Sequence, residues 1–159
     1  MAEEVAVDLL ERQEWLEPVE SGLQKAVSGT FDSAGAAGRP IRNFLHGVWL
    51  GHPLHPVLTD VPLGAWTAAI VLDAMEAAGN KQCAAGADAA VKIGLIGAVG
   101  AALAGLTDWQ ATDGSARRIG LIHGLLNITS ASLFTASMMA RSRRERSTGR
   151  MPIRRLLST

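Results

Sequence analysis

The sequence has little cysteine and few aromatic residues. Its 159 residues contain one cysteine, Cys83, together with no tyrosine, three phenylalanines and four tryptophans. A single cysteine excludes an internal disulfide and any Cys-x-x-Cys redox or zinc motif. The formal net charge is zero, so there is no bulk electrostatic attraction to nucleic acid.

Motifs of several enzyme classes are also missing. The sequence has no nucleophile elbow of the kind that Ser-His-Asp hydrolases use. The glycine-rich stretch 97–105, "GAVGAALAG", lacks the Lys-Ser/Thr ending of a phosphate-binding loop. We therefore expect a binding module rather than a catalyst.

Charge is distributed unevenly between the two ends. Residues 1–42 carry eight acidic and four basic side chains, whereas residues 141–155 carry seven arginines and one glutamate. The acidic start has neither the basic region nor the apolar region of a cleavable signal peptide, so we expect membrane insertion to depend on internal segments. The asymmetry suggests a molecule with a defined orientation.

Three apolar segments dominate the rest of the chain, at residues 58–78, 89–109 and 119–140. Each has about 20 residues, which as a helix spans a hydrocarbon core of about 30 Å. The fold predicted is therefore all-α, an integral membrane helical bundle with three spans. A soluble helical bundle is the alternative, because polar side chains interrupt the segments at Asp60, Asp73, Lys92, His123 and Asn127.

The second apolar segment favours the membrane interpretation. Residues 93–106 are almost free of polar side chains on every face, unlike a surface helix. Small residues recur every fourth position, as at Gly97, Ala101 and Gly105. Such spacing lets helices in lipid approach closely, while in water each helical glycine costs about 1 kcal/mol relative to alanine.

The N-terminal third of the sequence is predicted to lie outside the three spans. Apolar side chains at helical spacing in residues 3–31 indicate an amphipathic helix that Pro18 kinks or divides, and residues 28–40 suggest a linker. Residues 41–51, "IRNFLHGVWLG", suit a short helix at a membrane interface. We divide the chain into arm and linker (1–40), interfacial segment with "GHPLHP" (41–57), three-span domain (58–140) and basic tail (141–159).

Polar residues of the three spans collect at one end of the predicted bundle. The start of the first span, the end of the second and the start of the third lie on the same side of a three-span hairpin. The side chains gathered there are His52, His55, Asp60, Asp108, Trp109, His123 and Asn127. Ionisable groups at membrane depth are costly and usually pair, line a cavity or serve function.

Histidine is the commonest metal ligand and an axial ligand of haem. We expect His52, His55 and His123 to bind haem b, or to bind a divalent metal ion together with Asp60 and Asp108. Aspartate can ligate directly or orient an imidazole. Asn127, Trp109 and His46 are expected to support the site.

Each of these residues also has an ordinary structural interpretation. The histidines can simply form hydrogen bonds at the interface, and Asp60 can cap a helix N-terminus. Asp108 can pair with Arg117 or Arg118, and the prolines of "GHPLHP" can break the entry segment. The rival function is then a cofactor-free membrane anchor or assembly module that packs with partner helices.

Sidedness follows from the arginines. The cluster after the third span predicts a cytoplasmic C-terminal tail. The loop between the second and third spans would then lie outside, although Arg117 and Arg118 conflict with that placement.

Three stretches, "FLHGVWLGHPLHPVLTDVPLGAWTAAIVLD", "GLTDW" and "RRIGLIHGLLN", resemble the bacterial domain of unknown function 2231 family. Its members are predicted multi-span membrane domains, often fused to a Rieske-type iron–sulfur domain, and "ERQEWLEPV" resembles the start of such fusions. The resemblance implies the bacterial inner membrane and electron transfer with a redox partner. The residues that match the motifs are His52, His55, Asp60, Asp108, Trp109 and His123.

Two departures from the family accompany this resemblance. Members usually carry a fourth span where this sequence stops at "MPIRRLLST", and one cysteine cannot ligate an iron–sulfur cluster. We expect either a shortened paralogue or a bundle that a homo-oligomer or a partner chain completes.

Extraction separates the two fold predictions. If the apolar segments cross the bilayer, the protein will stay in the membrane pellet after washing with alkaline carbonate and enter solution only with detergent. Full recovery in buffer without detergent would instead identify a soluble helical bundle.

Overall fold

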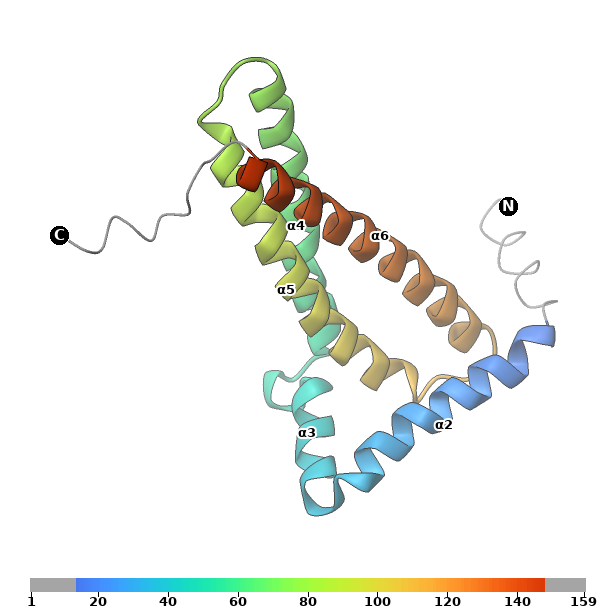
Figure 1. Cartoon of the computed structure of the whole chain (residues 1–159). Coiled ribbons are helices and arrows are strands. Elements are labelled where there is room, and N and C mark those ends of the chain that lie inside the picture. The colour runs from blue at the N-terminus through green and yellow to red at the C-terminus, as the bar shows by residue number, and fades with distance from the viewer. Residues whose placement is uncertain (1–13, 148–159) are drawn as a thin grey trace, which may run out of the picture.

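The computed structural model of the chain describes residues 14–147, with side chains over 15–143, and these residues are almost entirely helical (Figure 1). Five α-helices follow one another, joined by three short 3₁₀ turns. The α-helices are α2 (Glu17–Ser33), α3 (Gly38–Leu45), α4 (Leu54–Ala77), α5 (Cys83–Trp109) and α6 (Gly114–Ser147). The turns are η1 (Glu14–Leu16), η2 (Gly35–Ala37) and η3 (Val48–Leu50).

Three of these helices are long and apolar enough to cross a membrane, namely α4, α5 and residues Gly114–Arg143 of α6. The described residues contain no strand, so the all-α prediction with three spans is confirmed. The predicted boundaries were too narrow: α4 starts four residues before residue 58, and α6 starts at Gly114 rather than residue 119. Leu54–Pro56 of "GHPLHP" therefore form the first turn of α4, since proline is tolerated there.

Close packing of α4 against α5 builds most of the tertiary structure, and Figure 1 shows the two helices side by side. Glycines of α5 lie directly under large side chains of α4. A Cβ atom added to Gly94 would stand 2.2 Å from the Trp66 ring nitrogen, and one at Gly97 would stand 2.6 Å from a Val61 methyl group. The small residues of α5 therefore serve the close helix approach that their spacing predicts.

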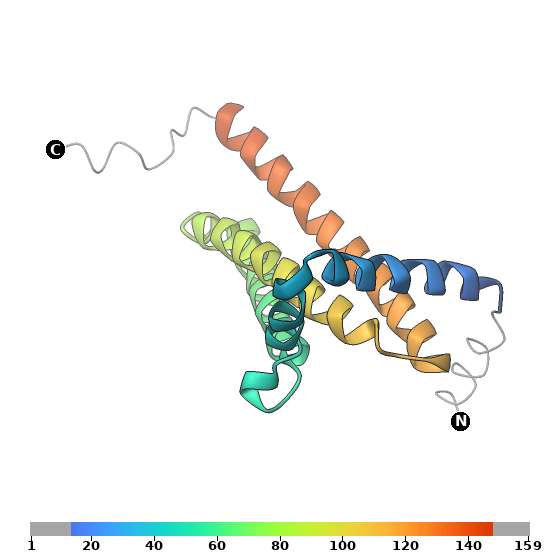
Figure 2. The same cartoon turned by 90° about the horizontal axis from the view of Figure 1, so that it is seen from below.

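Helix α6 packs less closely and diverges from the α4–α5 pair in both views (Figures 1 and 2). Its middle is held by the Phe134 ring, which stacks on Trp66 with centroids 4.3 Å apart. Near its C-terminal end, the Arg141 guanidinium pairs with Asp73 of α4 and, at 2.9 Å, with Asp88 of α5. Arg141, the first residue of the segment predicted as a basic tail, therefore joins three helices.

The N-terminal arm also differs from its prediction. Pro18 lies in the first turn of α2, which begins at Glu17, because the first turn needs no amide donor. This helix start agrees with the predicted division at Pro18 and not with a kink. The predicted linker at 28–40 is wrong, since α2 continues to Ser33 and α3 begins at Gly38. Gly38 packs so tightly on Phe31 that a Cβ atom would lie 1.9 Å from the Phe31 carbonyl oxygen. The predicted helix before residue 14 lies outside the described residues.

Large apolar side chains remain exposed along α4, α5 and α6, as at Leu63, Ile96 and Leu133. Ile96, in the middle of α5, is 74% exposed. In water such a surface opposes folding, whereas lipid chains are as apolar as these side chains. The exposed surface therefore agrees with spans that face lipid.

A single methyl group tests the α4–α5 contact. Gly94→Ala forces a Cβ atom into the Trp66 ring and should lower the unfolding free energy by about 1–3 kcal/mol. Gly64→Ala is the matched control, because no atom lies within 4 Å of a Cβ at that helical position. Thermal unfolding in detergent, followed by circular dichroism, should separate the variants. Equal stability of both would contradict the contact.

Candidate functional site

Two histidines from different helices face each other at the end of the bundle where α4 begins. His55 lies in the first turn of α4 and His123 lies in the third turn of α6. Their ring centroids are 6.0 Å apart, and the ring planes are nearly perpendicular at 89°. The structure therefore brings together two of the three histidines predicted to bind a cofactor.

Helix α5 fixes the orientation of the His55 ring. The Nδ1 atom lies 2.8 Å from the Ala101 carbonyl oxygen, so this nitrogen carries the proton and donates the hydrogen bond. Gly105, one turn further along α5, leaves room for the ring, since a Cβ there would lie 2.8 Å from ring atoms Nδ1 and Cε1. In the neutral ring, Nε2 then keeps a lone pair.

Asn127 lies one helical turn after His123 and contacts it twice. Its side-chain amide nitrogen donates to the His123 carbonyl oxygen at 2.8 Å and lies 3.0 Å from the ring nitrogen Nε2. Both residues are exposed on α6. The Asn127 amide therefore occupies the His123 Nε2 atom.

His46 and Asp108 form a separate pair. The His46 Nδ1 atom lies 2.6 Å from an Asp108 carboxylate oxygen, and both side chains are partly buried. His46 directly follows α3, and Asp108 is next to the last residue of α5, so the contact ties the arm to the three-span domain. The alternative pairing of Asp108 with Arg117 or Arg118 is wrong, because Glu20 binds those arginines.

The remaining predicted ligands lie apart from these pairs. His52 is exposed, and its Nδ1 donates to the Pro53 carbonyl oxygen at 2.8 Å. Asp60 is exposed in the second turn of α4, so it does not cap the helix, which is preceded by Pro53. Within residues 14–147, no group of three or more His, Cys, Asp or Glu side chains is arranged to hold a metal ion. The predicted site thus consists of one His–His pair and one His–Asp pair.

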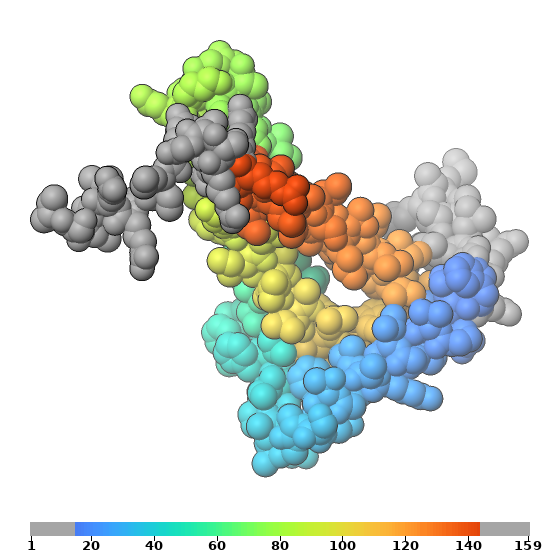
Figure 3. Space-filling view, viewed as in Figure 1, coloured from blue at the N-terminus to red at the C-terminus, as the bar shows by residue number. Residues whose placement is uncertain are grey.

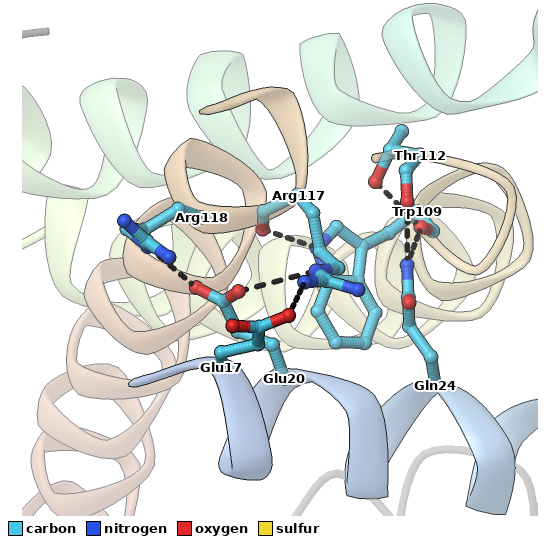
Figure 4. A network of polar contacts seen from close by, with 7 residues as sticks. All are labelled: Glu17, Glu20, Gln24, Trp109, Thr112, Arg117 and Arg118. Atoms are coloured by element: carbon cyan, nitrogen blue, oxygen red, sulfur yellow. Dashed lines mark hydrogen bonds and ion pairs between the residues drawn. The ribbon is translucent and has the colours of Figure 1, made fainter. Parts of the chain in front are cut away.

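A fully buried carboxylate, which we did not expect from the sequence, lies nearby (Figure 4). Glu20 of α2 accepts a hydrogen bond at 3.1 Å from Nε of Arg117 and a second at 3.1 Å from Nε of Arg118. Glu17 adds a longer ion pair with Arg117 at 3.8 Å. A buried charge with opposite charges on two sides is stable, whereas an unpaired one is costly.

Gln24 and Ser28 extend this contact along the same face of α2. The Gln24 amide donates to the carbonyl oxygens of Trp109 at 3.0 Å and Thr112 at 2.8 Å (Figure 4). Ser28 donates to the side-chain oxygen of Gln110 at 3.1 Å. The last carbonyl groups of a helix have no hydrogen-bond donors within that helix. The Gln24 amide supplies such a donor at the C-terminal end of α5. Polar residues four apart at 20, 24 and 28 were the available sequence signal.

Trp109 connects the end of α5 to the start of α6. Its ring nitrogen donates to the Arg117 carbonyl oxygen at 2.7 Å. The ring covers Gly120, where a Cβ would lie 2.3 Å from it. The residue is buried and fixes the start of the helix that carries His123.

Three apolar spanning helices and a terminal group of polar side chains define a small multi-pass membrane protein. Residues 51–159 match the family described as a predicted membrane protein, DUF2231, and the chain belongs to that family. No curated protein and no solved structure matches the chain. Residues 14–50, which form the docked arm, precede the matched region.

The buried carboxylate gives a stability prediction. Glu20→Gln keeps the side-chain shape but leaves Arg117 and Arg118 without their shared charge, which should cost about 3–5 kcal/mol. Glu17→Gln, at an exposed position, should cost less than about 1 kcal/mol. Thermal unfolding together with protease cleavage in α2 measures both. An effect of Glu17→Gln as large as that of Glu20→Gln would refute the assignment.

Proposed function

We propose that the His55–His123 pair binds haem b or a divalent metal ion and that the protein supports electron transfer within the membrane. The observation that carries this proposal is the meeting of two imidazole rings from α4 and α6 at one end of the bundle. Two ligands from different helices also make binding depend on the tertiary fold. Ionisable groups inside membrane helices are costly, and they usually pair, line a cavity or mark a functional site.

The separation of the rings suits one shared ion. Two imidazoles that each bind a metal through nitrogen at about 2.0–2.1 Å have centroids about 5–6 Å apart. The observed 6.0 Å lies at the upper end of this range. His55 and His123 would together hold a haem iron, whereas a divalent ion would take its other ligands from water or a partner.

The donor atoms fit the same role. His55 presents Nε2 with its other nitrogen fixed on a backbone carbonyl, the arrangement that ligating histidines normally show. For His123, a group binding at Nε2 has to displace the Asn127 amide. A bound haem would supply one-electron chemistry, and the chain's own residues would hold and orient it.

The helices leave open space between them. Figure 3 shows the surface hollowed between α2, the C-terminal half of α5 and the N-terminal half of α6. A flat macrocycle needs more open space than a small ion. The sequence predicted that Asp60 and Asp108 would help the histidines to bind a metal ion. Both lie away from the His55–His123 pair, so this argument for a metal ion is weaker.

The partner and location follow from the family resemblance and the charges. Rieske-type fusions among similar sequences suggest a redox partner in the bacterial inner membrane. The arginines that follow α6 favour a cytoplasmic tail. Arg117 and Arg118, which conflicted with that orientation, share their charge with Glu17 and Glu20.

A second candidate is a cofactor-free anchor or assembly module, and the loose packing of α6 favours it. One open face of α6 carries Ile128, Ala131, Ser132, Thr135, Ala136 and Met139. Small side chains on such a face permit close approach of a partner helix or of a second copy. In that case the histidines serve only as interfacial hydrogen-bonding groups.

An absorption spectrum separates the candidates. Protein purified in detergent should show a Soret band that shifts on reduction with dithionite, or bound metal by elemental analysis. His55→Ala and His123→Ala should each lose the group, while His52→Ala should keep it. Asn127→Ala should bind at least as well, since the competing hydrogen bond is removed.

Two results would decide against a cofactor. One is the absence of both a Soret band and bound metal after expression with added haem precursor and metal. The other is a His55→Ala/His123→Ala variant that is as stable as the unchanged protein and associates equally well with a partner helix or a second copy. Both results favour the anchor.

A further inference from the structure

We propose that residues 41–50 form a lipid-binding surface in the headgroup region of the leaflet where α4 begins. These residues, the C-terminal half of α3 and the turn η3 after it, are called the interfacial turn below. This inference is independent of any cofactor at the histidine pair. It concerns an exposed apolar surface outside the spanning helices.

The interfacial turn presents large apolar side chains outward. Phe44, Val48 and Trp49 are 58%, 66% and 61% exposed, and Ile41 and Leu50 are also exposed. The Phe44 and Trp49 rings stack with centroids 5.7 Å apart and planes 14° apart. The Trp49 ring nitrogen donates to the Phe44 carbonyl oxygen at 3.2 Å. The two rings thus form one apolar surface with its polar atom satisfied.

The backbone holds these side chains outward. Gly47 and Gly51 have φ angles of 75° and 77°, left-handed values that favour glycine. A Cβ on Gly47 would lie 2.2 Å from the His52 carbonyl oxygen, so the turn is tightly closed. The His46–Asp108 contact at 2.6 Å fastens the turn to the end of α5. A fixed turn cannot fold its apolar side chains back into the protein.

The position of the turn identifies lipid as the occupant. Leu50 precedes the first residue of α4 by four positions, and the exposed Val57 and Val61 continue the apolar surface into the span. A 24-residue helix is about 36 Å long, more than a hydrocarbon core of about 30 Å. The start of α4 therefore reaches the interface, where tryptophan is enriched.

Charge complements this placement. Residues 38–53 contain Arg39 and Arg42 but no aspartate or glutamate. Arg39 is exposed, and Arg42 lies near the Phe31 ring and at 3.8 Å from Asp32. Guanidinium groups beside an apolar surface suit lipid phosphates, because an interfacial helix places apolar atoms among acyl chains and cations among headgroups.

Tryptophan fluorescence tests the depth of the turn. The full chain is reconstituted in phosphatidylcholine vesicles, and the Trp49 signal is obtained by subtracting the spectrum of Trp49→Phe. We expect the Trp49 emission to be blue-shifted. Lipids brominated near the headgroup end of their acyl chains should quench most of its intensity. Bromine near the bilayer centre should quench less, because Trp49 lies at the interface.

Two variants separate lipid contact from misfolding. Val48→Asp places a charge in the apolar surface and should shift the Trp49 emission to the red, while Asn43→Asp, at a polar position of α3, should not. Quenching of Trp49 by aqueous iodide but not by bromolipid would overturn the proposal and place the turn in water. Protection from both quenchers would also overturn it, because protein from a second copy or another chain would then cover the turn.

Discussion

The contact between α4 and α5 across the glycines of α5 is the constraint on which the structure depends. Gly94 and Gly97 receive Trp66 and Val61 of α4, and Gly105 lies under the ring of His55. These positions fall on one face of α5, so a single line of small residues both closes the hairpin and seats the histidine. The same close approach brings the Ala101 carbonyl within 2.8 Å of the ring. Packing and site geometry therefore have a common cause.

Polar contacts at its two ends, together with one aromatic stack, determine where α6 lies. Arg141 binds Asp73 and Asp88 at one end. Glu20 binds Arg117 and Arg118 at the other, with Trp109 bonded to the Arg117 carbonyl. Charged contacts of this kind are strong where water is scarce, and removal of one partner is costly. His123, on the third turn of α6, takes its position from the end held by the arm.

The arm docks through polar groups rather than through its apolar face. Glu20, Gln24 and Ser28 bind the α5–α6 connection, while Val19 and Leu23 stay exposed. For a helix in water this would be unusual, because apolar burial normally drives docking. Beside a membrane, the apolar side chains of the arm can be buried in lipid instead of in the protein. The ends of α5 and α6, by contrast, need hydrogen-bond donors and charges from the arm to satisfy their polar groups. Residues 14–50 precede the region that matches the family.

Local patterns in the sequence were sufficient to predict the helices, the three spans and the small-residue packing of α5, because length, hydropathy and residue size are local properties. The resemblance also led to the correct family. The predicted helix boundaries were less accurate where a proline lies in the first turn of a helix, a position that tolerates proline. Pro18 lies in the first turn of α2, and Pro56 lies in the first turn of α4. The segment 28–40, which was predicted to be a linker, is mostly helical. Its small residues do not prevent helix formation, and one of them, Gly38, allows the tight contact with Phe31.

By itself the sequence determined that the chain is helical, that it crosses a membrane and that polar residues gather at one end. Only the tertiary structure decided which of those residues meet. His55 pairs with His123 and His46 pairs with Asp108, while His52 and Asp60 stay apart. The partners of Arg117, Arg118 and Arg141 were equally unpredictable, because each contact joins residues more than fifty positions apart. Such pairings depend on helix rotation and crossing, which are set by the packing of many side chains together.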